Sequence, residues 1–350
     1  MKIFGQVIYS NSFNPWFNLA LEDHLVDLVS QEAMEGRSRL ILYLWQNDNT
    51  VVIGRNQNAW MECKTELLEE DGGRLARRST GGGAVYHDLG NLNFSIITPK
   101  SMYETKRSLQ IIVNAVNKAG IKAYASGRND ILAQEAKFSG NAFLVRKEAG
   151  LHHGTILVDS DYARIGKYLN VPAAKLEYKG IKSVKSRVIN LAILNEGLTI
   201  EDMKRYVAEA FLEEYGPDII ESDYYYDEGD SDNFLDTHEK YASWDWRYGQ
   251  TIKFTSVMEK YFSWGNIQLC FTVSRGKVDQ AQIYTDALDS LFFAKLSKAL
   301  EGERYELTDM IKTLEACEES PDILDFTGRS VKEDIKGLIE DHMYNRDVET

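Results

Sequence analysis

Cysteine and basic residues are both scarce in this 350-residue chain. The cysteines are Cys63, Cys270 and Cys317, and they lie far apart. An odd number of widely spaced thiols predicts neither a disulfide framework nor a zinc site and favours a reducing compartment. Lys and Arg number 40 against 54 Asp and Glu, a net charge of −14. This balance disfavours a nucleic-acid-binding surface, although a local basic pocket is compatible with it.

Long apolar runs are also missing. The run LILYLW (40–45) is far too short to cross a bilayer. The opening MKIFGQVIYSNSF has one lysine, Gln6 interrupts its apolar stretch, and no small-residue cleavage site follows, so it predicts a first strand instead of a signal peptide. With 43% hydrophobic and 27% charged residues the composition is globular. We expect a soluble, cytoplasmic protein with no membrane partner.

The periodicity of the chain predicts an α+β fold. Asn14 and Pro15 are typical of a helix start, and leucines then recur at helical spacing to about residue 30. The segments 39–46 and 50–55 flank Asn-Asp-Asn and predict a β-hairpin. A second amphipathic helix is expected over 104–119. Neighbouring strands mixed with packed helices favour mixed β-sheets covered by helices over a regular βαβ alternation.

Two domains are expected. Residues 213–239 are acidic, rich in turn residues and tyrosine, and predict a surface loop. From about residue 250 two strands joined by a Ser-Arg-Gly-Lys turn precede two or three helices. We therefore expect a catalytic domain over 1–249 and a small α+β C-terminal domain over 250–350, which is long enough for its own core.

The stretch RRSTGGGAVYHDLGN (77–91) is the most unusual part of the chain. The phosphate-binding motif G-x-x-x-x-G-K-[ST] is absent, and a dinucleotide fingerprint starting at Gly81 fails at Tyr86. The motifs H-E-x-x-H, C-x-x-C and G-x-S-x-G are missing as well. Two interpretations stay open for this loop: a glycine hairpin with solvated arginines, or an anion cradle of backbone N–H groups beside arginine.

Two further stretches favour the anion cradle. AKFSGNAF (136–143) places Lys137 three residues before Gly140, and LHHGTILVD (151–159) places two histidines at the start of a strand. Each is weak alone, since a single lysine is usually a solvated charge and paired histidines usually pack. Together they suggest one site with cationic groups and flexible backbone.

These three stretches, in this order, closely resemble the signature of bacterial lipoate–protein ligases. Segments 17–23, 48–58 and 180–191 are also similar to that family. The resemblance covers essentially the whole chain. It implies the α+β catalytic fold shared with biotin–protein ligases, and a ligase that activates lipoate with ATP to lipoyl-AMP and passes the lipoyl group to a lysine of an acceptor. The implied acceptors are lipoyl-domain proteins: the acyltransferase subunits of 2-oxoacid dehydrogenases and the glycine-cleavage H protein.

The resemblance also implies roles for particular residues. Lys137 would be catalytic, holding the lipoate carboxylate and the α-phosphate in line. The ATP-binding residues would be Arg78, Gly83, Ala84, Val85, Tyr86 and Lys137, and the lipoate-binding residues Lys137, Trp45, His87 and His153. Magnesium is expected with ATP, because it offsets charge on the departing pyrophosphate.

Several alternatives stay open. Trp45 ends an apolar strand and is equally compatible with the core, and Asp130 suits a turn as well as a metal site. The basic segment 175–187 is either a solvated loop or a surface that meets pyrophosphate or an acidic acceptor. The rival functions are an ATP-independent lipoyl or octanoyl transferase, which would need a nucleophilic thiol if it formed an acyl-enzyme, and a binding protein without chemistry.

Overall fold

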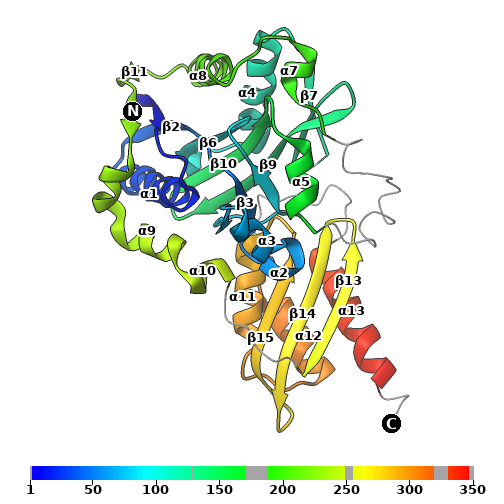
Figure 1. Ribbon diagram of the computed structural model, residues 1–350. Coiled ribbons are helices and arrows are strands. Elements are labelled where there is room, and N and C mark those ends of the chain that lie inside the picture. The colour runs from blue at the N-terminus through cyan, green and yellow to red at the C-terminus, as the bar shows by residue number, and fades with distance from the viewer. Residues whose placement is uncertain (1, 128, 171–187, 249–254, 319–329, 347–350) are drawn as a thin grey trace. The chain divides into compact units, whose positions relative to one another are not determined.

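The computed structural model describes residues 2–127, 129–170, 188–248, 255–318 and 330–346 (Figure 1). The chain forms two compact units. The large unit consists of Met1–Val52, Cys63–Arg77 and Val85–Arg247, and the small unit of Ile53–Glu62, Arg78–Ala84 and Tyr248–Thr350. The domain boundary expected between residues 249 and 250 lies outside the described residues, as does the basic segment 175–187.

The large unit is built on one mixed sheet. Its strands are β1 (Ile3–Ser10), β2 (Ser38–Trp45), β6 (Asn91–Pro99), β7 (Ala123–Ser126), β8 (Asp130–Ala133), β9 (Ala136–Arg146), β10 (Ala149–Leu157), β11 (Ile219–Ile220) and β12 (Tyr224–Tyr226). Within the described residues their order is β11-β1-β2-β6-β10-β9-β8-β7, and β12 also pairs with β1. The pairs that involve β1 are parallel, and the others are antiparallel.

Helices cover both faces of this sheet, as Figure 1 shows: α1 (Pro15–Met34) lies on one side, and α4 (Thr105–Lys118) and α8 (Ile200–Tyr215) on the other. Successive side chains of a strand point to opposite faces. Leu42 and Leu44 of β2 belong to the core formed with α4 and α8, so Tyr43 and Trp45 point toward the α1 face. The α+β prediction is confirmed, and so is the start of the first helix, where the Asn14 side chain accepts from the Trp16 N–H.

The predicted hairpin of segments 39–46 and 50–55 is wrong. The second segment contains β3 (Thr50–Ile53), which lies in a separate sheet of order β4-β3-β5 with β4 (Arg74–Arg77) and β5 (Val85–His87). Both edges of β2 are already paired, with β1 and with β6, and its side chains are buried on both faces. A strand that is buried on both faces has a continuous apolar sequence. Because both of its edges are paired, β2 cannot also pair with the segment 50–55 in a hairpin.

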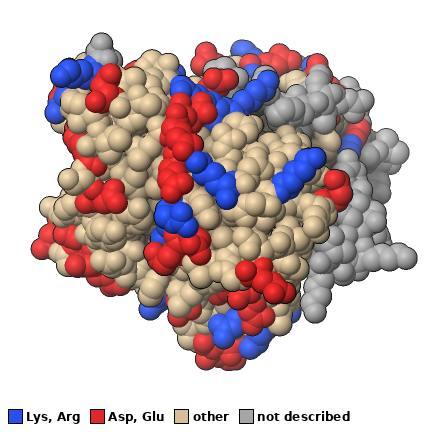
Figure 2. Space-filling model, turned by 90° about the horizontal axis from the view of Figure 1, so that it is seen from above, with Lys and Arg blue, Asp and Glu red and all other residues tan. Residues whose placement is uncertain are grey.

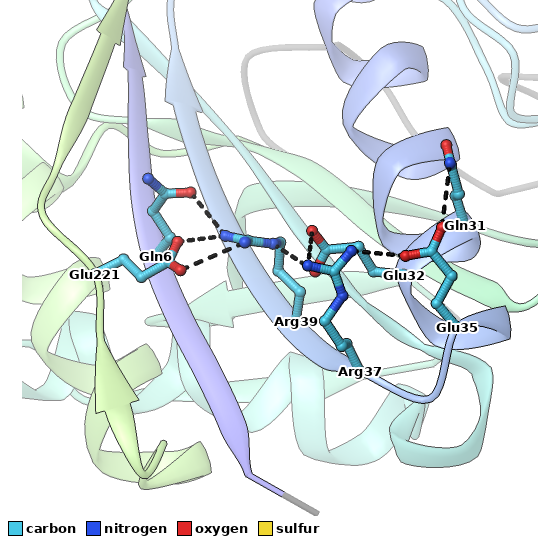
Figure 3. A network of polar contacts seen from close by, with 7 residues as sticks. All are labelled: Gln6, Gln31, Glu32, Glu35, Arg37, Arg39 and Glu221. Carbon is cyan, nitrogen blue, oxygen red and sulfur yellow. Dashed lines mark hydrogen bonds and ion pairs between the residues drawn. The ribbon is translucent and has the colours of Figure 1, made fainter.

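The acidic segment 213–239 is also not the predicted loop. After α8 it forms β11 and β12, the 3-10 helix η3 (Glu228–Phe234) and the first part of α9 (Leu235–Ala242), and α10 (Trp244–Tyr248) follows it. Tyr225 stacks on Tyr9 of β1 with ring centroids 4.8 Å apart. Arg39 of β2 contacts Glu221 directly after β11 and Glu32 of α1 (Figure 3). Pairing with β1 over two hundred residues away therefore orders a segment whose composition alone predicts a loop.

The remaining helical elements of the large unit are short. They are α3 (Thr65–Glu70), the 3-10 helix η1 (Lys100–Met102), α5 (Tyr162–Tyr168) and α7 (Leu191–Leu194). The helix expected over 104–119 is confirmed as α4, and Gly120 follows it with φ +77°.

The small unit has its own sheet and core. Its elements are α2 (Ala59–Glu62), β13 (Ser256–Phe262), β14 (Gly265–Ser274), β15 (Lys277–Thr285), α11 (Ser290–Leu300), α12 (Leu307–Ala316) and α13 (Val331–Arg346). The predicted Ser-Arg-Gly-Lys turn is confirmed between β14 and β15, with positive φ at Arg275 and Gly276, as a tight hairpin turn requires. Phe271, Phe292 and Phe293 lie at the centre of the apolar core.

The surface carries both signs of charge. On the face drawn in Figure 2, groups of Asp and Glu side chains lie next to Lys and Arg side chains, and uncharged surface surrounds these groups. In the described part of the chain, every helix is either too short or too polar to span a bilayer.

Candidate functional site

Four side chains on the α1 face of the large sheet form one hydrogen-bonded cluster. Trp45 Nε1 donates to Ser95 Oγ at 3.1 Å, and Ser95 Oγ donates to the Glu22 carboxylate. His153 Nδ1 lies 2.8 Å from Glu22 Oε1 and 3.0 Å from Oε2. The register explains the convergence, because Ser95 is paired with Tyr43 on one side and with His153 on the other. Since the carboxylate accepts hydrogen bonds, Nδ1 of His153 carries the hydrogen.

His87 joins this cluster from the second sheet. Its ring meets Trp45 edge-on with centroids 6.3 Å apart, and Asn47 Nδ2 lies 3.1 Å from its Nδ1. Trp45, His87 and His153 are all buried. The structure thus brings the three residues of the predicted lipoyl pocket together. Trp45 belongs to the buried core and also takes part in the cluster, and its contact with lipoate stays a prediction.

His152 has a different environment from its neighbour. It lies between Phe143, stacked at 4.8 Å, and Phe94, edge-on at 5.0 Å, and its Nε2 lies 2.9 Å from Asn141 Oδ1. Burial, and then the adjacent His153, lower the pKa of His152 to about 3. The imidazole of His152 is therefore neutral at pH 7, with its hydrogen on Nε2.

Lys137 lies near the start of β9 and is paired with an acid of the neighbouring strand. Its Nζ is 2.6 Å from Asp130 Oδ1, and about a third of its side chain is exposed. A Cβ placed on Gly140 would be 3.0 Å from Lys137 Nζ and 3.1 Å from its Cε. The lysine side chain therefore lies flat over Gly140, and the missing side chain of this glycine makes room for it.

A β-bulge puts Lys137 and Gly140 on the same face. Residues three apart in a regular strand point to opposite faces. Here the register between β8 and β9 shifts at Ile131/Leu132, so that Asp130 is opposite Gly140 while Leu132 is opposite Lys137. Such a shift re-aims the side chains that follow it.

The same register places the lysine on the sheet face that carries the Trp45–His153 cluster. Ala142 is opposite His153, so Gly140, two residues earlier, shares the His153 face. Trp45, Ser95, His153 and Lys137 thus lie on one face of four successive strands, β2, β6, β10 and β9. Three strand spacings amount to roughly 14 Å.

The glycine loop belongs to the small unit. Arg78 is buried there, and its Nη2 donates to the carbonyls of Gly81 and Gly83 at 2.8 Å each. Its Nε donates to Thr80 Oγ1 at 3.1 Å. In this structure the loop therefore wraps its own carbonyl oxygens around the arginine.

The glycines of this loop differ in what surrounds their Cα atoms. A Cβ on Gly81 would be 2.1 Å from the carbonyl oxygen of Ala287, and Gly82 donates its N–H to that same oxygen. Gly81 is thus required by close packing within the small unit. Gly83 has open space where a Cβ would project, so its backbone is the part of the loop that a ligand can approach.

Val85 and Tyr86 belong to β5, at the edge of the small β4-β3-β5 sheet within the described residues. The Tyr86 hydroxyl donates to Asn49 Oδ1 at 3.0 Å, and Arg164 Nη1 donates to it at 3.4 Å. Burial raises the pKa of Tyr86. The predicted ATP-binding residues are divided between the units, with Arg78, Gly83 and Ala84 in the small one.

Arg77, next to the glycine loop, has a structural role. Its Nε donates to the Trp246 carbonyl and its Nη2 to the Arg247 carbonyl, both at 2.8 Å, and Trp246 Nε1 donates back to the Arg77 carbonyl. Arg77 therefore bonds to the backbone of α10, whereas Arg78 bonds to the backbone of the glycine loop.

None of the three thiols is activated. Burial raises the pKa of Cys63 to about 12 and that of Cys270 to about 12, and burial also raises the pKa of Cys317. An acyl-enzyme cysteine needs the opposite shift.

The sequence interpretation missed three residues of the site. Glu22 and Ser95 complete the pocket cluster, and Asn141 holds the turn before Asp130. An acid within the apolar stretch FNLALED (17–23) was the available signal for Glu22, since a buried carboxylate needs partners. Within the described residues, no group of three or more His, Cys, Asp or Glu side chains is arranged to hold a metal ion.

Comparison with protein families gives two matches. Residues 14–212 match the lipoyl protein ligase A/B catalytic domain, and residues 251–339 match the bacterial lipoate protein ligase C-terminus. The first match alone covers more than half of the chain.

Solved structures are also similar to this chain, and one of them covers nearly its whole length. LipL1 of P. falciparum, crystallised in complex with lipoate, is 32% identical with a TM-score of 0.82, covering 96% of this chain and 99% of LipL1. The bi-partite lipoate protein ligase of Thermoplasma acidophilum, studied with its E2 lipoyl domain, is 28% identical with a TM-score of 0.61, covering 73% and 100% of the two chains. Lipoate-protein ligase A bound with ATP is 26% identical with a TM-score of 0.59, covering 71% and 99%.

Proposed function

The chain belongs to the lipoate–protein ligase family, and on that premise we propose that it is an ATP-dependent lipoate–protein ligase. The observation that carries the proposal is the shared face of the large sheet, where the register brings Trp45 and His153 onto the same face as the Lys137 side chain. An apolar acyl chain in the pocket would end with its carboxylate at a fixed positive charge. The lipoate-bound and ATP-bound relatives support lipoate and ATP as the substrates.

In the first proposed step, a lipoate carboxylate oxygen attacks the α-phosphorus of ATP. A new P–O bond forms, the bond between the α-phosphorus and the bridging oxygen breaks, and pyrophosphate leaves with the bonding electrons. The two reacting groups are both anions, so a fixed cation between them stabilises the developing charge. Lys137 is placed for this role.

In the second step, the neutral amine of an acceptor lysine attacks the acyl carbon of lipoyl-AMP. An amide bond forms, AMP leaves with the former carboxylate oxygen, and the amine loses its proton to solvent. Lys137 polarises the carbonyl during this attack. The E2 lipoyl domain studied with the archaeal relative supports a lipoyl-domain protein as the acceptor. The acyltransferase subunits of 2-oxoacid dehydrogenases and the glycine-cleavage H protein are the acceptors we propose.

The loop from Arg78 to Tyr86 is the proposed nucleotide site. A guanidinium has five N–H donors, so Arg78 can hold loop carbonyls and also supply positive charge to a phosphate. The open side of Gly83 and the edge of β5 offer backbone N–H groups. Magnesium is proposed to enter with ATP, held mainly by phosphate oxygens and water, because Mg²⁺ commonly takes only one or two protein carboxylates. The cytoplasmic location expected from the sequence stays a prediction.

The ATP-independent transferase is the rival function. The raised pKa values of the three thiols disfavour an acyl-enzyme route. A binding protein that has lost its chemistry is disfavoured because Arg78, Lys137 and the loop glycines are all present.

The test is the intact mass of an apo lipoyl domain incubated with the protein, lipoate and Mg-ATP. We expect a gain of one lipoyl group that disappears without ATP. Lys137→Met should lower the rate of adenylate formation at least ~100-fold, as loss of a single charge-stabilising group does in other enzymes. Lys147→Met is the matched control, because that lysine is exposed and paired with Asp27 beyond the other end of β9.

Two results would contradict the proposal. A mass gain from an acylated carrier in the absence of ATP would establish the transferase. Full activity of Lys137→Met would remove the lysine from the catalytic role.

A further inference from the structure

We propose that Asp130 is a positioning residue for Lys137, and that Asn141 holds Asp130 in place through Asn129. The inference rests on the proposed function, because it concerns how the proposed catalytic lysine is aimed. Its starting point is the 2.6 Å contact between Lys137 Nζ and Asp130 Oδ1, two side chains that are both partly exposed.

The backbone before Asp130 is fixed by Asn141. The Asn141 backbone N–H and its side-chain Nδ2 both donate to the Asn129 carbonyl, at 2.9 and 3.0 Å, and Asn129 Nδ2 donates to the Asn141 carbonyl at 2.9 Å. Three hydrogen bonds thus join the turn before β8 to the middle of β9. Because Asp130 directly follows Asn129, its carboxylate is held at a set position along β9.

Asn141 is itself fixed from the core. It is 3% exposed, and its Oδ1 accepts from Nε2–H of the neutral His152 and, at 3.4 Å, from Ser139 Oγ. Buried amides that are hydrogen-bonded through both their oxygen and their nitrogen hold one rotamer. A chain of hydrogen bonds therefore runs from His152 through Asn141 and Asn129 to the residue that pairs with Lys137.

The chemistry explains why such an anchor is useful. An ammonium has three N–H donors on a long flexible side chain. With one donor bound to Asp130 and the stem lying over Gly140, the other two point in fixed directions. Two donors are the number needed to bridge a carboxylate oxygen and an α-phosphate oxygen. Without the anchor the ammonium would sample several rotamers, and a misplacement of about 1 Å can cost about 100-fold in rate.

The experiment measures the two half-reactions of the full-length protein separately: pyrophosphate release from ATP and lipoate, and transfer from prepared lipoyl-AMP. We expect Asp130→Ala to lower kcat of adenylate formation about 10- to 100-fold while KM for lipoate and for ATP stays unchanged. Asp130→Glu should recover part of the loss. Glu135→Gln is the matched control, because Glu135 is on the same hairpin but accepts from the Tyr124 hydroxyl instead of a lysine, and its kcat should equal that of the parent protein.

Asn141→Ala tests the rest of the chain of hydrogen bonds. We expect it to lower kcat as Asp130→Ala does, and the double variant to lose no more than Asp130→Ala alone, because both act on one position. Thermal midpoints are measured for all variants, so that a kcat loss is scored only in a folded protein. If Asn141→Ala is too unstable to assay, the Asp130 variants decide the proposal alone.

The outcomes separate this inference from the proposed function. An unchanged kcat in Asp130→Ala, while Lys137→Met abolishes adenylation, overturns the positioning role alone. Activity of Asp130→Ala that returns at higher Mg²⁺ also overturns it, because the carboxylate would then be a metal ligand. If Lys137→Met adenylates lipoate normally, the proposed function fails first.

Discussion

The two adjacent histidines of the HHG segment show how strand alternation assigns different chemistry to neighbouring residues. His153 faces α1 and is bonded to a carboxylate, whereas His152 points into the opposite core between two phenylalanines. The pair that looks like one feature in the sequence therefore divides into a pocket residue and a structural residue. Burial of the structural residue, His152, strongly lowers its pKa.

This lowered pKa predicts acid sensitivity of the large unit. The pKa of His152 is about 3 in the folded chain and about 6.5 when unfolded. Between these values only the unfolded chain binds the proton, so the stabilisation is complete above pH 6.5 and is lost as pH falls toward 3. We expect a loss of about 1.4 kcal/mol per pH unit from this group below pH 6.5. Urea midpoints of the parent protein and of His152→Gln between pH 8 and pH 5 measure it.

The control for this measurement is Phe138→Leu, which removes a fully buried ring of β9 without removing a titratable group. It should shift the urea midpoint equally at each pH. If His152→Gln shows the same pH slope as the parent protein, His152 is not the group that makes the fold acid-sensitive.

At the scale of elements, the glycine loop combines two functions that its sequence does not separate. Gly81 packs against the Ala287 carbonyl, whereas Gly83 faces open space. The interpretation of the loop as a hairpin with solvated arginines is wrong, because Arg77 and Arg78 are both buried. Close packing explains Gly81, and ligand binding at Gly83 stays a prediction.

Substitution with alanine should separate the two. Gly81→Ala brings a Cβ to 2.1 Å from a backbone oxygen, an overpacking that typically costs about 1–3 kcal/mol, so the thermal midpoint should fall. Gly83→Ala meets nothing and its φ is not positive, so stability should stay within about 0.5 kcal/mol. If a phosphate lies against this backbone, the same variant should raise KM for ATP. Calorimetry and steady-state kinetics on both variants provide the measurement, and an unchanged KM in Gly83→Ala would mean that the nucleotide lies elsewhere.

What the sequence predicts well at this scale is local. The helix start at Asn14 and the turn at Arg275-Gly276 depend on a few neighbouring residues and are confirmed. The predicted hairpin and the predicted acidic loop are wrong because strand pairing depends on partners far along the chain, as between Tyr225 and Tyr9.

In the site, too, local features are predictable from the sequence and long-range contacts are not. Motif residues such as Lys137 are visible in the sequence, whereas Glu22 meets His153 across 131 positions, a distance that local patterns do not reveal.

At the scale of the whole molecule, the chain passes between its two units several times. Segments Ile53–Glu62 and Arg78–Ala84 belong to the small unit although they are early in the sequence. Thr285 donates its N–H to the Asn56 carbonyl at 2.8 Å, and Ser290 Oγ donates to the Ser79 carbonyl at 3.2 Å. The proposed nucleotide loop is therefore ordered by residues from the C-terminal third of the chain, whereas Trp45, His153 and Lys137 are all in the large unit.

This division predicts what happens when the chain is cut after residue 247. The fragment 1–247 keeps the whole pocket face, so lipoate affinity measured by calorimetry should match that of the full chain. The partners of Asn56, Ser79 and Gly82 are gone, so trypsin should cleave after Arg55 and Arg78 faster, and adenylation should be lost. Adding residues 248–350 as a separate chain should restore adenylation.

The matched control is the full chain cleaved between residues 248 and 255, which retains every one of these partners and should stay active. The fragment alone could instead adenylate lipoate at the parent rate. In that case the glycine loop does not depend on the small unit, and the nucleotide site lies within the large unit.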